Sequence, residues 1–231
     1  MGKSATMQNM EIEITEIYTG TLFVKTYCFP LDADTIAIVD PGGADDELLD
    51  YVKAKKAKNV SIMITHGHFD HVGGIAGLLQ IYPDAKVYIH HDDRAYLGET
   101  GIAEHIKCFA PIHLDRYITQ YEKEYKTFPP PTDIINDGDM VNGFKVIHTP
   151  GHTPGSVCFY HEAAGILFAG DTLFYHTFGR TDLYGSSESA LKHSLRRLID
   201  LPDETKVYPG HGRDTVMGEE KAGIKAATAE S

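Results

Sequence analysis

The 231-residue sequence is poor in cysteine, has fewer basic than acidic side chains, and contains no long apolar run. Its three cysteines, Cys28, Cys108 and Cys158, are odd in number and form no Cys-x-x-Cys pair. This usage argues against a disulfide framework and predicts a cytoplasmic protein in a reducing compartment. No stretch is long and apolar enough to cross a bilayer, and the start lacks the apolar segment of a signal peptide, so no membrane is expected as a partner.

The charge balance narrows the range of partners further. Lysine and arginine number 21 against 33 acidic residues, which gives a formal net charge of -12. A chain this acidic is not expected to bind the phosphate backbone of a nucleic acid or an anionic membrane surface. The hydrophobic content of 42% is typical of a globular protein and is sufficient for a sizeable core.

Hydrophobic periodicity and turn residues predict strands and helices that occur twice over along the chain. Strands are predicted at 12–17, 21–29, 35–39, 60–64, 86–90, 133–135, 140–141, 144–148, 156–160, 166–169 and 206–208. Helices are predicted around 48–53, at 75–81, along 111–128, after a Ser186–Ser187 cap, and at 215–229. This repetition without a linker predicts an α+β fold with two packed sheets and helices outside. One domain is expected over 1–231, with residues 1–10 disordered.

The 111–128 segment carries an aromatic stripe at helical spacing. We expect this stripe to pack on the core, while a lid over a substrate or a partner surface is the alternative. Its members are Leu114, Tyr117, Ile118, Tyr121, Tyr125 and Phe128.

The polar cluster between Thr65 and His71 is the strongest chemical signal in the sequence. Three imidazoles and one carboxylate occur within six residues: His66, His68, Asp70 and His71. The apolar run before the cluster predicts a buried strand, so the cluster lies on a loop at the carboxyl end of that strand, where α/β sheets place ligands. Imidazole and carboxylate suit zinc, iron or manganese.

Three further polar residues follow predicted strands at turns marked by glycine or proline. They are His152 in Thr-Pro-Gly-His-Thr-Pro-Gly, Asp171 in Ala-Gly-Asp-Thr, and His211 in Tyr-Pro-Gly-His-Gly. A single residue of this kind at the end of a strand is more often part of a turn than a metal ligand. Together with the cluster they supply five imidazoles and two carboxylates, a number that suits two metal ions with an open position.

This pattern, His-x-His-x-Asp-His at 66–71 followed by His152, Asp171 and His211, resembles the metallo-β-lactamase superfamily over about residues 12–220. The resemblance implies a four-layer αββα sandwich. It also implies two divalent metal ions, with zinc preferred and iron or manganese as alternatives. His66, His68 and His152 would hold one ion and Asp70, His71 and His211 the other, with Asp171 bridging. Asp171 departs from the true β-lactamase branches, which disfavours antibiotic hydrolysis.

Within the superfamily, the segments Gly-Asp-Thr-Leu-Phe at 170–174 and Gly-Arg-Thr-Asp-Leu at 179–183 resemble the short single-domain members of the glyoxalase II group. The resemblance makes Arg180 the candidate anchor for the substrate, and an ion pair with Asp182 is the alternative role. Tyr175 and His176 follow Asp171 closely and are further candidates to line the substrate site. The helical domain with which glyoxalase II grips glutathione has no counterpart in residues 212–231, so the thiol carrier stays open.

The resemblance implies hydrolysis of a small-molecule acyl thioester by a hydroxide that bridges the two metals, with Asp70 and Asp171 orienting it. The oligomeric state is open, and a homodimer is one option. The first alternative is an iron-dependent persulfide dioxygenase, in which His66, His152 and Asp171 would hold a single iron. A lactone or other ester hydrolase of the same superfamily is the second, and a metal-binding protein without activity is the third.

Overall fold

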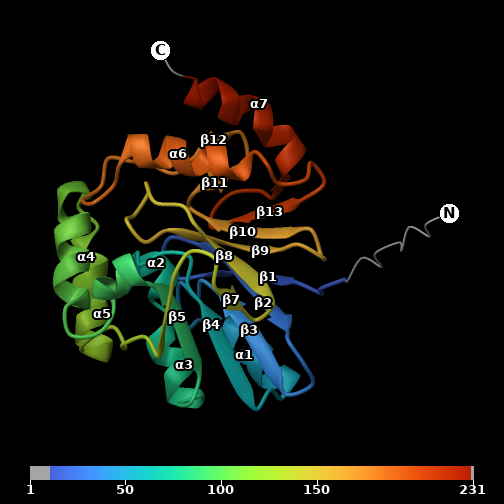
Figure 1. Ribbon diagram of the computed structural model, residues 1–231. Helices are drawn as coiled ribbons and strands as arrows, with labels where there is room; N and C mark the ends of the chain where they lie inside the picture. Colours follow the sequence, from blue (N-terminus) through green and yellow to red (C-terminus); the bar gives the residue numbers. More distant parts are fainter. Residues whose placement is uncertain (1–10, 230–231) are drawn as a thin grey trace.

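The computed structural model describes residues 11–229 as two six-stranded sheets and a two-stranded hairpin, with helices on the outside (Figure 1). The predicted disorder of residues 1–10 lies outside the described residues. The first sheet has the order β1 (Thr15–Thr19), β2 (Val24–Pro30), β3 (Thr35–Val39), β4 (Asn59–Met63), β5 (Lys86–His90) and β6 (Asp133–Ile135). The second has the order β14 (Thr215–Val216), β13 (Lys206–Pro209), β10 (Ile166–Gly170), β9 (Val157–His161), β8 (Phe144–His148) and β7 (Met140–Val141). The hairpin joins β11 (Leu173–Phe174) to β12 (Thr177–Phe178).

The helices cover the outer faces of the two sheets. On the side of the first sheet they are α1 (Asp46–Lys55), α2 (Phe69–Val72), α3 (Ile75–Ile81), α4 (Gly101–Phe109) and α5 (Asp115–Tyr125). The short 3₁₀ helices η1 (His91–Tyr96) and η2 (Ala110–Ile112) precede α4 and α5. On the side of the second sheet they are α6 (Glu188–Leu198) and α7 (Met217–Thr228), drawn in orange and red in Figure 1. The predicted αββα sandwich is confirmed.

Three hydrophobic clusters hold the four layers together, one at each interface between layers. The central cluster lies between the sheets, and its largest members include Phe29, Phe144 and Phe168. The Phe29 ring of the first sheet lies 5.5 Å from the Phe168 ring and 5.4 Å from the Phe144 ring of the second, so the two sheets meet through aromatic packing. Removing one such buried ring costs about 3–5 kcal/mol of stability, because a cavity remains.

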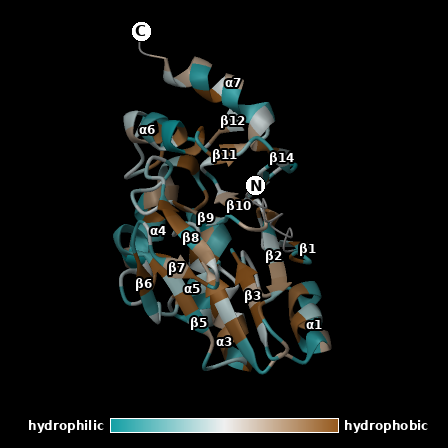
Figure 2. Cartoon of the chain, turned by 45° about the vertical axis from the view of Figure 1, so that its right-hand side comes forward, coloured by the Kyte–Doolittle hydropathy of each residue, from teal (hydrophilic) through white to brown (hydrophobic). Residues whose placement is uncertain are grey.

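The outer clusters join each sheet to its helices, and the sequence pattern explains them. In α1, Leu48 and Val52 are buried four residues apart on one face. In α6, the Ser187 side chain accepts a hydrogen bond from the Ala190 N–H, which is the predicted cap. Figure 2 shows the strands between the helices as largely brown, whereas α1 and α7 alternate between teal and brown. Within residues 11–229, every helix is too short or too polar to cross a membrane.

The predicted 111–128 helix was wrong in its extent. The structure has a 3₁₀ turn at Ala110–Ile112, and α5 ends at Tyr125 because Lys126 has a positive φ of 71°. Phe128 is fully buried after the helix has ended, and the Tyr121 ring stacks on it at 3.9 Å. The aromatic stripe therefore packs against the core, as the first interpretation of its sequence expected. The sequence patterns did not reveal α4 or α2.

Strand direction places several loops at one edge of the sandwich. The strands β3, β4 and β5 are parallel neighbours, so the loops after Val39, Met63 and His90 leave the first sheet at the same end. In the second sheet β10 and β13 are also parallel, and the loops that carry Asp171 and His211 follow them. The functional residues predicted from the sequence follow these strand ends.

Candidate metal centre

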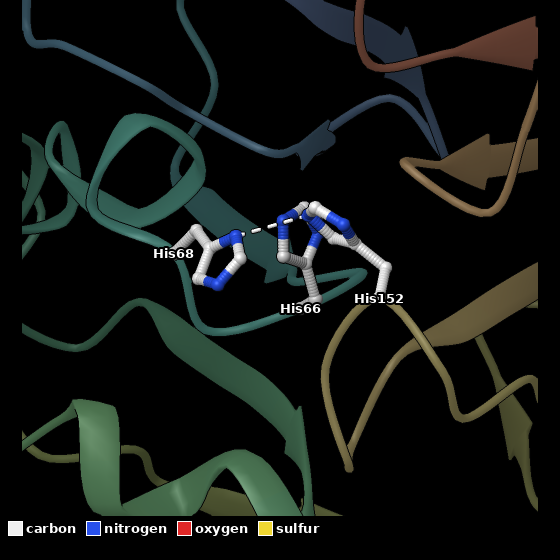
Figure 3. A group of neighbouring side chains, drawn as sticks. All are labelled: His66, His68 and His152. Carbon is white, nitrogen blue, oxygen red and sulfur yellow. Dashed lines mark hydrogen bonds between the residues drawn. The ribbon is translucent and has the colours of Figure 1, made fainter. Parts of the chain in front are cut away.

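The structure brings six of the seven predicted ligands together in two neighbouring groups. His66, His68 and His152 form one group, and Asp70, His71 and His211 form the other; in each group the candidate ligand atoms lie within 4.8 Å of one another. Figure 3 shows the imidazoles of the first group, which come from two separate loops and turn toward one another. The Nε2 atom of His152 lies 3.0 Å from the Nδ1 atom of His68.

Asp171 lies between the two groups. Its Oδ2 atom is 3.6 Å from the Nε2 atom of His152, and its Oδ1 atom is 3.4 Å from the Nε2 atom of His71. The two oxygens of one carboxylate thus each face a histidine of a different group. This is the placement that a bridging ligand requires.

Hydrogen bonds to protein acceptors orient three of the imidazoles. The Nδ1 atom of His71 lies 2.9 Å from Asp40 Oδ2, and that of His152 lies 2.9 Å from the Arg180 carbonyl oxygen. The Nδ1 atom of His66 lies 3.1 Å from the Thr65 hydroxyl, which itself donates to Asp40. With Nδ1–H as the donor in each pair, the Nε2 lone pairs turn inward, as metal-binding histidines require.

The donor set fits a cation because buried polar atoms within it have no hydrogen-bond partner. Among the described residues, His66 Nε2, His71 Nε2 and Asp171 Oδ1 are three such atoms. Unpaired buried polar atoms are costly, so atoms that converge on one point favour a bound ion. Imidazole nitrogen and carboxylate oxygen are ligands of zinc and iron.

Protonation in the centre also suits metal binding. Burial and the imidazole of His71 hold the pKa of His66 well below its ordinary value, and burial and His152 do the same for the pKa of His68. Burial raises the pKa of Asp171, but the neighbouring His71 outweighs this effect and the net pKa is low. Neutral imidazoles and ionised carboxylates are the forms that bind metals.

His71 differs from the other histidines because three carboxylates surround it. Burial lowers its pKa, yet the charges of Asp171, Asp40 and Asp70 together raise it well above the ordinary value. The local charge is therefore negative and attracts positive charge. A divalent ion bound by His71 would take the place of a proton on this imidazole.

The centre opens toward solvent on one side. The side chain of His211 is 31% exposed, whereas those of Asp70 and Asp171 are 10% and 12% exposed. His66, His68 and His71 are buried. The side of the centre that carries His211 and the two carboxylates is therefore the least covered by protein.

The three predicted substrate residues lie in less direct positions. The Arg180 guanidinium makes two hydrogen bonds to Asp182, at 2.7 and 2.9 Å, while its backbone carbonyl holds His152. The Tyr175 ring lies 3.4 Å below the guanidinium of Arg213. The His176 N–H donates to Glu220 in α7, and its side chain is half exposed.

Two buried carboxylates that organise the centre escaped the sequence patterns. Asp40 accepts hydrogen bonds from the backbone and the hydroxyl of Thr65, in addition to its bond with His71. Asp93 accepts bonds from Gly67, Thr153 and Gly155. Both follow strands of the first sheet, at the same edge as the ligand loops, and that position was the available signal. Asp40 begins the segment Asp-Pro-Gly-Gly, whose composition is typical of a turn and hides this role.

A separate group of His90, Asp92 and His148 has ligand-type atoms close together but does not form a comparable centre. The His90 and His148 rings stack at 3.9 Å with an angle of 17° between their planes. A metal ion lies in the plane of each imidazole that binds it. Two rings that are stacked face to face therefore do not point their nitrogen lone pairs at one ion. The Nε2 atom of His148 also lies 2.9 Å from the Pro154 carbonyl oxygen.

Curated relatives match most of the chain. An uncharacterized protein of Aquifex aeolicus (strain VF5) is 37% identical over 80% of this chain and 82% of its own length. The probable metallo-hydrolase YqgX of Bacillus subtilis (strain 168) is 32% identical over 85% and 88%. The hydroxyacylglutathione hydrolase GloC of Haemophilus influenzae is 30% identical over 82% and 86%.

Solved structures with the same fold include the BLEG-1 B3 metallo-beta-lactamase, with a TM-score of 0.77, 29% identity, and coverage of 94% of this chain and 100% of that one. TTHA1623 in a di-iron-bound form has a TM-score of 0.70 at 32% identity, with coverage of 89% and 96%. ETHE1 from Myxococcus xanthus has a TM-score of 0.70 at 25% identity, with coverage of 95% and 86%.

The family model for the metallo-beta-lactamase superfamily matches residues 24–211, which include all seven residues of the centre. The match therefore spans both sheets and the loops at their common edge. This chain belongs to the metallo-beta-lactamase superfamily.

Proposed function

We propose that this protein is a metallo-hydrolase that cleaves a small acyl thioester in the manner of glyoxalase II. The observation that carries the metal part of the proposal is the pair of ligand groups with Asp171 between them. The similarity to a protein named hydroxyacylglutathione hydrolase supports the thioester part. The similarity to a protein named a probable metallo-hydrolase supports the hydrolytic reaction class.

In this proposal His66, His68 and His152 hold one divalent ion, and Asp70, His71 and His211 hold the second, with Asp171 as a ligand of both. Bound divalent ions lower the pKa of a shared water to about 7 and polarise the acyl carbonyl. Zinc is our preferred ion. The di-iron form of TTHA1623 supports iron as the alternative.

The protein groups supply orientation. The carboxylates of Asp70 and Asp171 are ionised, so they accept hydrogen bonds from the attacking water and direct its lone pair toward the acyl carbon. Addition of the water oxygen, with one proton passing to solvent, is followed by cleavage of the carbon–sulfur bond. The carboxylic acid and the thiolate so formed exchange the second proton and leave as a carboxylate and a thiol. A thiolate is a stable leaving group, since the thiol pKa is about 8.5, so no separate general acid is required.

Substrate binding is assigned to the open side of the centre. Arg180 is the proposed anchor for a negative group of the thiol carrier. Tyr175 and His176 are proposed to line the same approach. Arg180 already contacts Asp182, Tyr175 contacts Arg213, and His176 contacts Glu220. A bound substrate would compete with these contacts or extend them.

The second candidate function is that of a persulfide dioxygenase, and the similarity to ETHE1 supports this candidate. That reaction would use a single iron on His66, His152 and Asp171. One experiment separates the candidates: metal-free protein is reloaded with zinc, manganese or iron(II) and assayed with S-lactoylglutathione and with glutathione persulfide.

We expect thiol release from S-lactoylglutathione with two ions per chain. Oxygen consumption with glutathione persulfide at one iron per chain, without thiol release, would instead establish the second candidate. A lactone and a β-lactam are assayed as further substrates. If only one of these two compounds is hydrolysed and the thioester is not, the protein is assigned to that reaction of the superfamily instead.

A further inference from the structure

Asp93 joins the two loops that carry the first group of histidines, although it belongs to neither loop. It lies in η1, just after β5, and its side chain is fully buried. Its Oδ2 atom accepts hydrogen bonds from the Gly67 N–H at 2.8 Å and from the Thr153 hydroxyl at 2.7 Å. Its Oδ1 atom accepts a bond from the Gly155 N–H at 2.7 Å. One carboxylate thus ties the loop of His66 and His68 to the loop of His152.

Close packing on both sides of η1 limits how far the two loops can move. A Cβ atom at Gly67 would overlap the ring of Tyr96, and one at Gly155 would lie 2.5 Å from the backbone nitrogen of Asp93. Both glycines are therefore needed for the approach, which explains why glycine separates His66 from His68. The short helix acts as a spacer between the loops.

The three donors require an acceptor without donor groups of its own. An ionised carboxylate has two oxygens and about four lone-pair sites, which accommodate all three bonds. An asparagine at this position would present an NH₂ group to at least one of the same donors. Burying a carboxylate is costly, so its presence among three donors indicates a specific positional role.

We propose that Asp93 is a positioning residue of the metal centre, which sets the separation of the two histidine loops and thereby the affinity of the His66, His68 and His152 group for a divalent ion. The second ligand group is held by other contacts, chiefly the bond between His71 and Asp40. Loss of Asp93 should therefore weaken one ion site and spare the other. This inference rests on metal binding and not on the thioester reaction.

The test is a zinc titration of metal-free protein against a chromophoric chelator. Removal of a group that orients metal ligands costs about 10–100-fold in metal affinity, so Asp93→Asn should weaken one of two sites by this factor and change the other less than about threefold. Asp84→Asn is the matched control, since Asp84 is exposed and lies outside every group of candidate ligand atoms among the described residues. Its affinities should equal those of the wild type.

Two ligand variants identify which site has weakened. His152→Ala marks the site of the first group, and His211→Ala marks the other. The site lost in Asp93→Asn should be the one lost in His152→Ala. Wild-type affinity at both sites, equal weakening of both, or loss of the His211 site would overturn the proposal and leave Asp93 as a brace of the fold alone.

A milder pair of variants decides the question if circular dichroism shows that Asp93→Asn does not fold. Thr153→Val removes one of the three donors, whereas Thr153→Ser keeps the hydroxyl. We expect Thr153→Val to weaken the His152 site by about tenfold and Thr153→Ser to retain wild-type affinity. Wild-type affinity in Thr153→Val would overturn the proposal in that case.

Discussion

The Nε2 atom of His152 lies 3.0 Å from the Nδ1 atom of His68, although 84 positions separate the two residues. One comes from the loop after β4 in the first sheet, and the other comes from the loop after β8 in the second. Their approach depends on how the two sheets pack, with a core of aromatic rings between them. The centre thus lies where the two halves of the sandwich meet.

Asp171→Asn tests the bridging position. The amide carries no charge and offers one oxygen in place of two, so it cannot face both groups as an acceptor. We expect the metal content to fall from about two ions to about one per chain and kcat to fall at least about 100-fold. Elemental analysis and steady-state assays measure these changes. Asp182→Asn makes the same exchange at an exposed site and should change neither value; two tightly bound ions in Asp171→Asn would contradict the bridging role.

Asp40→Asn tests the support beneath His71. Asp40 has a positive φ of 51°, a conformation that asparagine tolerates, so the substitution changes the side-chain bonds and leaves the backbone unstrained. The NH₂ group would face donors on Thr65 and His71, and we expect a loss of about 2–3 kcal/mol in the free energy of unfolding of the metal-free protein. Urea denaturation measures it. The exposed Asp84→Asn should change stability by less than about 0.5 kcal/mol, and an equal loss in both variants would rule out the specific role.

His105 gives the metal-free protein an acid sensitivity. Its imidazole is fully buried beside Phe128, and burial lowers its pKa to about 3. The unfolded chain takes up a proton near pH 6.5, whereas the folded chain does not until about pH 3. Stability contributed by neutral His105 is therefore complete above pH 6.5 and is lost as the pH falls toward 3.

At pH 5 this effect amounts to roughly 2 kcal/mol. Between pH 7.5 and pH 5, the free energy of unfolding should fall less in His105→Leu than in the wild type, and the difference should be about this amount. Urea denaturation at both pH values measures it. His193→Gln, which changes an exposed histidine, should follow the wild type. An identical pH dependence in His105→Leu and the wild type would disprove the assignment.

Arg180→Ala separates substrate anchoring from loop shaping. The ion pair with Asp182 is half exposed, so solvent screens it and it adds little to stability. If Arg180 holds a negative group of the substrate, its removal should raise KM about tenfold, or about 1.4 kcal/mol, with little change in kcat. Asp182→Ala frees the guanidinium of Arg180, so the KM of this variant should equal that of the wild type or be lower. A similar rise of KM in both variants would show that the pair acts through the loop.

Much of the fold could be predicted from the sequence because its signals are local. Alternating and continuous apolar runs predicted β3, β5, β6, β7 and β8 at the bounds that the structure has. The Ser186–Ser187 cap predicted where α6 begins, and the Ser187 side chain makes the capping hydrogen bond. Helix ends were less predictable: the aromatic spacing continues to Phe128, but the backbone at Lys126 turns away first.

The sequence by itself determined which residue types stand at the strand ends, since turn residues and apolar runs are properties of neighbouring positions. It therefore named the seven candidate ligands, and the resemblance to the superfamily divided them into two groups with Asp171 between them. Only the tertiary structure decided which nitrogen of each imidazole faces inward, because that depends on acceptors such as Asp40 and the Arg180 carbonyl. It also decided that Asp93 spans two ligand loops, a relationship created by the parallel pairing of β4 and β5 and by the packing of the two sheets.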